Sequence, residues 1–328
     1  MKSHQIRHEQ SVLLLDMDNT LTDTRAWFAD FILQATEEVS TLLKEEHRSF
    51  NQLFADVAQS TTLHEYAYVI EAIASKLKKH RSISHRSIER ASRRFWQSFH
   101  HAHRQIKIYD GVHEVLVSIR KRFPGLRLVI LTDSPEWVTM ERLALTGLMP
   151  LIDGVVAIRT DMPKLRNRGY QRGLKLRHDE IIERMSQIDR RHLQLQMAIP
   201  AAYAKPSSAG VELAARRLHA EDKLIIVGDK ESKEGLAAEN WRQNKVDKAK
   251  TECSLEQCSI DFIKADWGNH DLDHHRYREL QSHIPSLKAG STPLDREVRI
   301  RSTAASLAQL PELIAEILYG RVQEAIAA

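Results

Sequence analysis

Cysteine and long apolar runs are both scarce in this sequence. Cys253 and Cys258 are the two cysteines among 328 residues, which excludes a disulfide framework and favours a reducing compartment, so we expect a cytoplasmic protein. No apolar run approaches the ~20 residues of a membrane span, and the charged N-terminal segment does not resemble a signal peptide. We therefore expect no association with a membrane.

The sequence also lacks a strong charge of either sign. Lysine and arginine number 48 against 44 aspartates and glutamates, which leaves a net charge of +4, and this bias alone does not indicate a nucleic-acid-binding protein. Hydrophobic residues make up 42% of the chain, a share that excludes a disordered protein. Histidine is abundant instead, with 17 residues. Either a pH-sensitive function or a histidine-rich surface accounts for this surplus.

Short apolar runs recur at wide intervals, and amphipathic helical patterns separate them. Such continuous leucine and β-branched runs are typical of strands that are buried on both faces of a parallel sheet. The alternation of strands and helices predicts an α/β fold with a doubly wound, Rossmann-like core. The runs occupy residues 12–15, 128–131, 155–158, 224–227 and 262–263.

The interval between the first and second runs is too long for one crossover helix. Apolar residues recur there at a spacing of three to four and predict three or more helices with no strand. We therefore assign residues 25–104 to an inserted helical cap and residues 1–24 and 105–328 to the core, with connections near Thr24 and Lys107. We predict that His100, His101 and His103 lie on the surface where the cap rejoins the core, and contact with a substrate is the alternative.

Two further segments are longer than this fold needs. The first begins at Lys164, ends at Arg177 and is dense in cations, so we predict a solvated loop. Steering of an anionic substrate and binding of nucleic acid are the alternative roles for this basic segment. The second, residues 244–259, is polar and contains both cysteines, and the sequence assigns no role to it.

Two carboxylates follow the first predicted strand. Side chains two residues apart in an extended chain point the same way, so Asp16 and Asp18 project together at the carboxyl end of the strand. Open α/β sheets bind ligands at that edge. Adjacent carboxylates repel unless a cation neutralises them, and Mg²⁺ prefers such oxygen ligands. The alternative is a turn in which these side chains only cap the strand end.

Polar side chains also follow the other predicted strands. A hydroxyl ends the second strand, an ammonium precedes a later helix, and an acid ends the fourth strand. Ser134 and Pro135 are predicted to cap the helix after the second strand, and a helix N-terminus binds anions. These strand-end residues are Thr132, Asp133, Lys205 and Asp229.

The ordered set Asp16-x-Asp18-x-Thr20, Thr132, Lys205 and Gly228-Asp229 resembles the four motifs of the haloacid dehalogenase-like hydrolase superfamily. The resemblance implies that Asp16 is a nucleophile that forms an aspartyl-phosphate. It implies that Asp18 is the general acid and then the general base.

The same resemblance implies a phosphate and metal site. Thr132, Asp133 and Lys205 would lie at the phosphoryl group, where the Asp133 carboxylate repels a dianion unless it turns to solvent or pairs with a cation. Mg²⁺ would be held by Asp16, Asp229 and the backbone carbonyl of Asp18. Because the superfamily usually carries a further acid four or five residues after the last motif aspartate, the resemblance implies that Glu234 supports the metal, with Glu231 as the alternative.

The second aspartate narrows the expected reaction. Superfamily members that cleave carbon–halogen or carbon–phosphorus bonds generally lack it, so Asp18 favours hydrolysis of a phosphomonoester. The inserted helices resemble the C1 cap of phosphoglycolate-phosphatase-like members, which closes over small substrates. We therefore expect a Mg²⁺-dependent phosphatase that acts on a small phosphorylated metabolite. The alternatives are a phosphomutase and a non-catalytic scaffold that binds nucleic acid through its basic segment.

Overall fold

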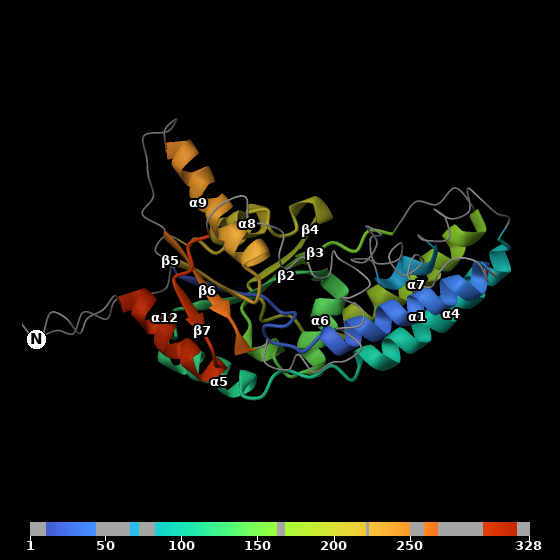
Figure 1. Ribbon diagram of the computed structural model, residues 1–328, viewed down its shortest axis with the longest axis horizontal. Helices are drawn as coiled ribbons and strands as arrows, with labels where there is room; N and C mark the ends of the chain where they lie inside the picture. Colours follow the sequence, from blue (N-terminus) through green and yellow to red (C-terminus); the bar gives the residue numbers. More distant parts are fainter. Residues whose placement is uncertain are drawn as a thin grey trace, which may run out of the picture.

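One parallel sheet forms the centre of the molecule (Figure 1). The computed structural model describes residues 11–43, 66–71, 83–162, 168–220, 223–249, 259–267 and 298–319. Seven strands lie in the order β4-β3-β2-β1-β5-β6-β7 and confirm the predicted α/β fold. The strands are β1 (Val12–Leu15), β2 (Arg127–Pro135), β3 (Gly154–Ile158), β4 (Leu195–Ile199), β5 (Lys223–Gly228), β6 (Ser259–Ala265) and β7 (Ser302–Ala304).

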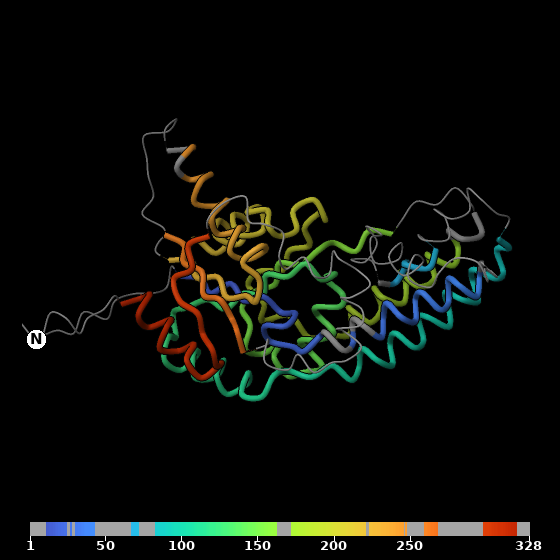
Figure 2. The backbone as a smooth tube through the Cα atoms, viewed as in Figure 1, coloured from blue at the N-terminus to red at the C-terminus, as the bar shows by residue number. Residues whose placement is uncertain are grey.

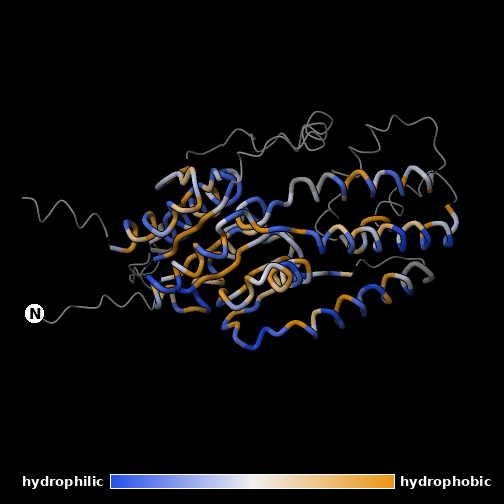
Figure 3. Tube along the Cα trace, turned by 90° about the horizontal axis from the view of Figure 1, so that it is seen from below, coloured by the Kyte–Doolittle hydropathy of each residue, from blue (hydrophilic) through white to orange (hydrophobic). Residues whose placement is uncertain are grey.

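Helices cover both faces of the sheet (Figure 1). Successive residues of β1 point to opposite faces, so Leu13 and Leu15 join one apolar cluster while Val12 and Leu14 join the other. Figure 3 shows long hydrophobic stretches of the chain inside the core, whereas hydrophobic and hydrophilic residues alternate along the long helices. The first face packs against α5 (Val112–Arg122), α6 (Glu136–Leu145) and α12 (Leu310–Tyr319), and the second against α8 (Ala209–Arg217) and α9 (Leu236–Ala249).

The carboxyl end of β1 lies where the order of the strands reverses. The chain proceeds from β1 through β2 and β3 to β4, and then continues with β5 on the other side of β1. A crevice forms outside the carboxyl ends of the strands at such a point. Short helical turns complete the fold at η2 (Tyr66–Tyr68), η3 (Met149–Leu151), η4 (Ala201–Tyr203), η5 (Glu231–Gly235) and η8 (Leu307–Gln309).

The sequence patterns missed strands β4 and β7. Strand β4 is at one edge of the sheet and carries an exposed Gln196, while β7 at the other edge has three residues. Edge strands need no continuous apolar run, because they are not covered on all sides. The polar segment 244–259 is described in part: α9 includes residues 244–249, while 250–258 lie outside the described residues.

Three long helices, which we call the outer helices, extend away from the sheet (Figures 1 and 2). They are α1 (Arg25–Leu43), α4 (His85–His103) and α7 (Arg168–Gln187). The chain leaves and re-enters the core through two adjacent segments, which an isolated antiparallel bridge between Thr22 and Ile108 and a hydrogen bond of 3.2 Å from Asp23 N–H to the Lys107 carbonyl join. None of the helices in the described part of the chain is long and apolar enough to cross a membrane.

Helix α7 contradicts the prediction of a solvated loop between Lys164 and Arg177. Residues 163–167 lie outside the described residues, but 168–177 are helical. The helix buries Leu174, Ile181 and Met185, whose spacing places them on one helical face.

Polar contacts also join α7 to the segments inserted after β1. The Arg177 guanidinium forms a buried ion pair with Glu71, and the hydroxyl of Tyr68 lies 2.7 Å from His178 Nδ1. Trp96 Nε1 of α4 donates to Glu180 Oε2 at 3.1 Å. Helix α7, which follows a core strand, therefore belongs to the same helical layer as α1 and α4.

Two of the histidines near the end of α4 are buried, which contradicts their predicted place on the surface. His100 and His103 are 8% and 0% exposed, whereas His101 is exposed. Burial, followed by the charges of Arg184 and Arg104, lowers the pKa of His100 to about 3. Burial lowers the pKa of His103 as well. Both imidazoles are therefore neutral in the folded protein at neutral pH.

These buried histidines predict a loss of stability in mild acid. The unfolded chain takes up a proton at His100 below about pH 6.5, while the folded chain does not until about pH 3, so stability falls as pH decreases through this window. Between pH 7.5 and pH 5 we expect His100 to account for about 2 kcal/mol of the lost unfolding free energy. Urea unfolding at both pH values should show a weaker pH dependence for His100→Gln.

His101→Gln is the matched control, because the neighbouring His101 is exposed. It should lose as much stability as the wild type over the same interval. Equal pH dependence in all three proteins would contradict the assignment of a neutral, buried His100.

Candidate active site

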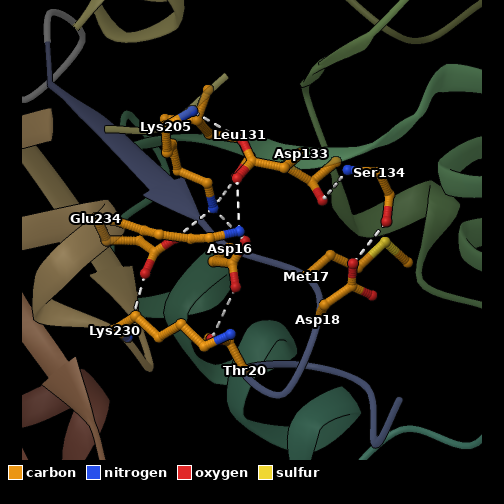
Figure 4. Close-up of polar contacts among 12 residues, drawn as sticks. Asp16, Met17, Asp18, Thr20, Leu131, Asp133, Ser134, Lys205, Lys230 and Glu234 are labelled. Atoms are coloured by element: carbon orange, nitrogen blue, oxygen red, sulfur yellow. Dashed lines mark hydrogen bonds and ion pairs between the residues drawn. The ribbon is translucent and has the colours of Figure 1, made fainter. Parts of the chain in front are cut away.

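Asp16, the first residue after β1, lies at the centre of a buried polar cluster (Figure 4). Its backbone N–H continues the pairing with β5 by donating to the Val227 carbonyl at 2.9 Å. Lys205 Nζ lies 2.5 Å from Asp16 Oδ1 and also donates to the Leu131 carbonyl at 3.2 Å. Thr20 Oγ1 donates to Asp16 Oδ2 at 3.3 Å. Lys205 and Thr20 therefore hold one oxygen each of this carboxylate, while β5 fixes the backbone that carries it.

Glu234 is the second acidic partner of Lys205. It is 1% exposed, and its Oε2 accepts a hydrogen bond from Lys230 N–H at 3.1 Å. Its side chain packs over Gly228, where a Cβ atom would overlap Glu234 Cγ. Glu231 turns away and pairs with Lys264 at 2.9 Å. The structure thus places Glu234, and not Glu231, next to Asp16.

Three carboxylates meet at this point. One oxygen from each of Asp16, Asp229 and Glu234 lies within 4.8 Å of the other two. One ammonium, that of Lys205, pairs with two of these three acids. Burial raises the pKa of Asp16, Lys205 opposes this, and the neighbouring acids raise it further. A hard divalent cation suits this donor set, because it takes carboxylate oxygens and neutralises the excess negative charge.

Substitutions of Glu234 and Glu231 should differ in their effect on the Mg²⁺ concentration that activity requires. Glu234→Gln removes one charged oxygen donor from the acidic group, so we expect the Mg²⁺ concentration for half-maximal activity to rise at least about tenfold. Glu231→Gln is the control, since Glu231 pairs with Lys264 instead. Activity measured over a Mg²⁺ titration checks both variants. An equal change in the two would contradict a role of Glu234 in binding a metal.

Asp133 pairs with cations. Its carboxylate is therefore neutralised and does not repel a phosphate. Its Oδ1 accepts from Lys205 N–H at 2.9 Å, and its Oδ2 accepts from Lys233 Nζ at 2.9 Å. Burial alone would raise its pKa, but Lys233 and Lys205 outweigh burial and lower the pKa to about 2. The Asp133 carboxylate therefore braces the segment that carries Lys205.

Thr132 and Ser134 lie at the end of β2. Thr132 is 1% exposed, and its Oγ1 accepts from Ser134 N–H at 3.1 Å, so its hydroxyl can still donate to a bound anion. The predicted helix cap at Ser134 is wrong: β2 continues to Pro135, which caps α6. Ser134 Oγ instead donates to Asp18 Oδ2 at 2.5 Å.

Asp18 is the more accessible of the two aspartates, with 29% of its side chain exposed. Arg142 Nη1 contacts its Oδ1, so both carboxylate oxygens are held. Sequence patterns missed Arg142. The available signal was its position four residues after Val138, which places both side chains on one face of a helix, where an arginine is rarely buried unless it is paired. Trp267, two residues after β6, donates from Nε1 to the Thr20 carbonyl at 2.8 Å.

Comparisons with known proteins agree with this architecture. The sequence profile of the haloacid dehalogenase-like hydrolases matches residues 13–178. A phosphatase of this family from Thermococcus onnurineus has a similar structure, with a TM-score of 0.50, 15% identity, and coverage of 93% of this chain and 97% of that one. At this identity, the similarity shows the fold alone. No curated protein sequence matches the chain.

Two further solved structures are similar at lower scores. A predicted phosphoglycolate phosphatase from Haemophilus somnus is 12% identical, with a TM-score of 0.43 and coverage of 79% of this chain and 87% of that one. A 2-haloacid dehalogenase from Pseudomonas syringae is 14% identical, with a TM-score of 0.45 and coverage of 94% and 99%.

Proposed function

The chain belongs to the haloacid dehalogenase-like hydrolase family, and from this membership we propose that it is a Mg²⁺-dependent phosphatase that works through an aspartyl-phosphate. The observation that carries the proposal is the pair of aspartates after β1. Asp16 is buried beside an ammonium, while Asp18 is partly exposed and held by Ser134 and Arg142. Hydrolysis of a phosphate ester uses two such carboxylates, one as the nucleophile and one as the proton carrier.

In the first step, an Asp16 carboxylate oxygen attacks phosphorus. The bond between phosphorus and the ester oxygen breaks, and Asp18 gives its proton to the departing oxygen. Lys205 and the Thr132 hydroxyl are placed to donate to the phosphoryl oxygens as negative charge develops. The products of this step are a free alcohol and a phosphoryl group on Asp16.

In the second step, Asp18 takes a proton from a water molecule that attacks the same phosphorus. The bond between phosphorus and Asp16 breaks, which releases inorganic phosphate and restores both carboxyl groups. Asp16, Asp229 and Glu234, with the backbone carbonyl of Asp18, would hold Mg²⁺, which supplies positive charge that lets an anionic nucleophile approach a phosphate. Each step conserves charge and atoms with water as the only co-substrate.

We propose that the outer helices act as a cap over this site. Helix α1 follows the loop that carries Asp16 and Asp18, and α4 returns to the core at Lys107, so the site lies at the base of this layer. A cap of this kind excludes water while a small substrate is bound. We therefore propose a small phosphorylated metabolite as the substrate class.

A paired assay tests this function against the dehalogenation seen in the same family. Phosphate release should be measured over a panel of metabolite phosphates, with Mg²⁺ and with a chelator, and halide release over a set of 2-haloacids. We expect phosphate release that the chelator abolishes and Mg²⁺ restores. Halide release without phosphate release would contradict the proposal.

A further inference from the structure

Arg142 is a buried cation in direct contact with the proposed general acid. It is 0% exposed, and its Nη1 contacts Asp18 Oδ1. Its guanidinium carbon lies 4.9 Å from the centre of the Trp27 ring. Since Arg142 belongs to α6 of the core and Trp27 to the outer helix α1, the guanidinium is held where the two parts of the molecule meet.

This arrangement is costly for stability. Nε and Nη2 of Arg142 are buried, and neither has a hydrogen-bond partner in the part of the chain that the structure describes. A buried guanidinium with unused donors destabilises a fold, and an apolar side chain of similar length is often better tolerated. The neighbouring His103 offers no negative charge to offset the guanidinium, and burial and then Arg142 lower its pKa. Packing alone therefore does not explain an arginine at this place.

We propose that Arg142 is a positioning residue that determines which oxygen of Asp18 carries the transferable proton. This inference rests on the proposed phosphatase function. A guanidinium only donates hydrogen bonds, so the Asp18 oxygen that contacts Nη1 must accept. When Asp18 is neutral, its proton consequently lies on Oδ2, 2.5 Å from Ser134 Oγ. A serine hydroxyl can accept from this proton or donate to the bare oxygen, so it suits both forms.

Both proton transfers in the proposed reaction would then use Oδ2 of Asp18. In the first step the Oδ2–H bond breaks as the ester oxygen gains that proton, and in the second step Oδ2 takes a proton from water. Arg142 keeps Asp18 in one orientation throughout. Without it, the carboxyl can rotate and present its proton away from the departing oxygen, which slows this step and not the binding of the phosphate.

The dependence of the rate on the leaving group tests the proposal. An alkyl phosphate such as glycerol phosphate needs a proton on its departing oxygen, whereas 2,4-dinitrophenyl phosphate does not. For Arg142→Met we expect kcat/KM to fall by about 10²-fold with the alkyl phosphate, within the range for general acid catalysis. With the dinitrophenyl ester we expect a fall of less than about fivefold. Asp18→Asn should show the same selectivity with a larger loss.

Arg120→Met is the matched control, because Arg120 donates to Asp153 at 2.9 Å and contacts neither aspartate of the site. Any change in its rates should be the same for both esters. Arg142→Lys keeps a donating cation and covers the case in which the methionine variant does not fold. It should recover part of the alkyl phosphate activity and remain selectively impaired with that ester.

A uniform loss on both esters, in either Arg142 variant that folds, would overturn the positioning role while leaving the phosphatase function in place. Absence of phosphate release by the wild type from any ester would instead refute the proposed function, and with it the role of Arg142. The two failures are thus distinguished by the wild-type rates.

Discussion

Asp16→Asn is expected to lower phosphate release by at least about 10⁴-fold at every Mg²⁺ concentration. The asparagine has nearly the shape of aspartate, and its amide oxygen can still accept from Lys205, but a neutral amide does not attack phosphorus. The fold should remain intact, because one of three clustered acids is removed while Lys205 keeps Glu234 as a partner. Steady-state phosphate release and urea unfolding measure the two effects.

Asp229→Asn is the informative comparison for this variant. Asp229 belongs to the same acidic group but is not the proposed nucleophile. We expect its loss of activity to be partly recovered at high Mg²⁺ concentration, whereas that of Asp16→Asn is not. Recovery of Asp16→Asn by Mg²⁺ would show that Asp16 binds metal without acting as the nucleophile.

Lys205→Met should lower activity by about 10³-fold and also make stability strongly dependent on Mg²⁺. The side chain of Lys205 is 4% exposed, and its ammonium contacts both Asp16 and Glu234. Its removal takes away a donor to the transferred phosphoryl group, a loss of the size seen for other charge-stabilising donors. It also leaves buried carboxylates without their cation, which we expect to cost about 3–5 kcal/mol of unfolding free energy in a chelator.

Mg²⁺ supplies positive charge to the same acids, so it should stabilise Lys205→Met more than it stabilises the wild type. Unfolding in urea, with Mg²⁺ and with a chelator, measures the difference. Lys233→Met is the control, because Lys233 pairs with Asp133 at 2.9 Å, outside the acidic group. A stability of Lys205→Met that does not respond to Mg²⁺ would contradict a metal site formed by these acids.

Most of the polar cluster could be predicted from sequence because its members follow buried strands. Asp16 and Thr132 each directly follow the apolar run of a buried strand, and parallel strands bring such positions to one edge of the sheet. Glu234 could be chosen over Glu231 only from its spacing after Asp229, and the structure gives the reason: its side chain fits over Gly228.

The contacts that could not be predicted join residues far apart in the chain. Arg142 lies 124 positions from Asp18, and no local pattern shows which acid a buried arginine meets. The sequence around Arg177 predicts a charged loop, because its partner Glu71 is 106 positions away and no local pattern indicates the ion pair. The burial of His103 likewise depends on α6 and on Trp27, whose ring centre lies 5.8 Å from that of His103. These features follow from how the outer helices pack on the core, which local periodicity does not specify.

The most direct test is to trap the phosphoryl group on Asp16. Asp18→Asn should be mixed with 2,4-dinitrophenyl phosphate and Mg²⁺, quenched in acid within the first turnover, digested and analysed by mass spectrometry. The ester departs without a proton, but the second step lacks its base, so the intermediate should accumulate. We predict a burst of dinitrophenolate equal to the enzyme concentration and a phosphoryl group on Asp16. No burst, or a phosphoryl group on another residue, would contradict the account.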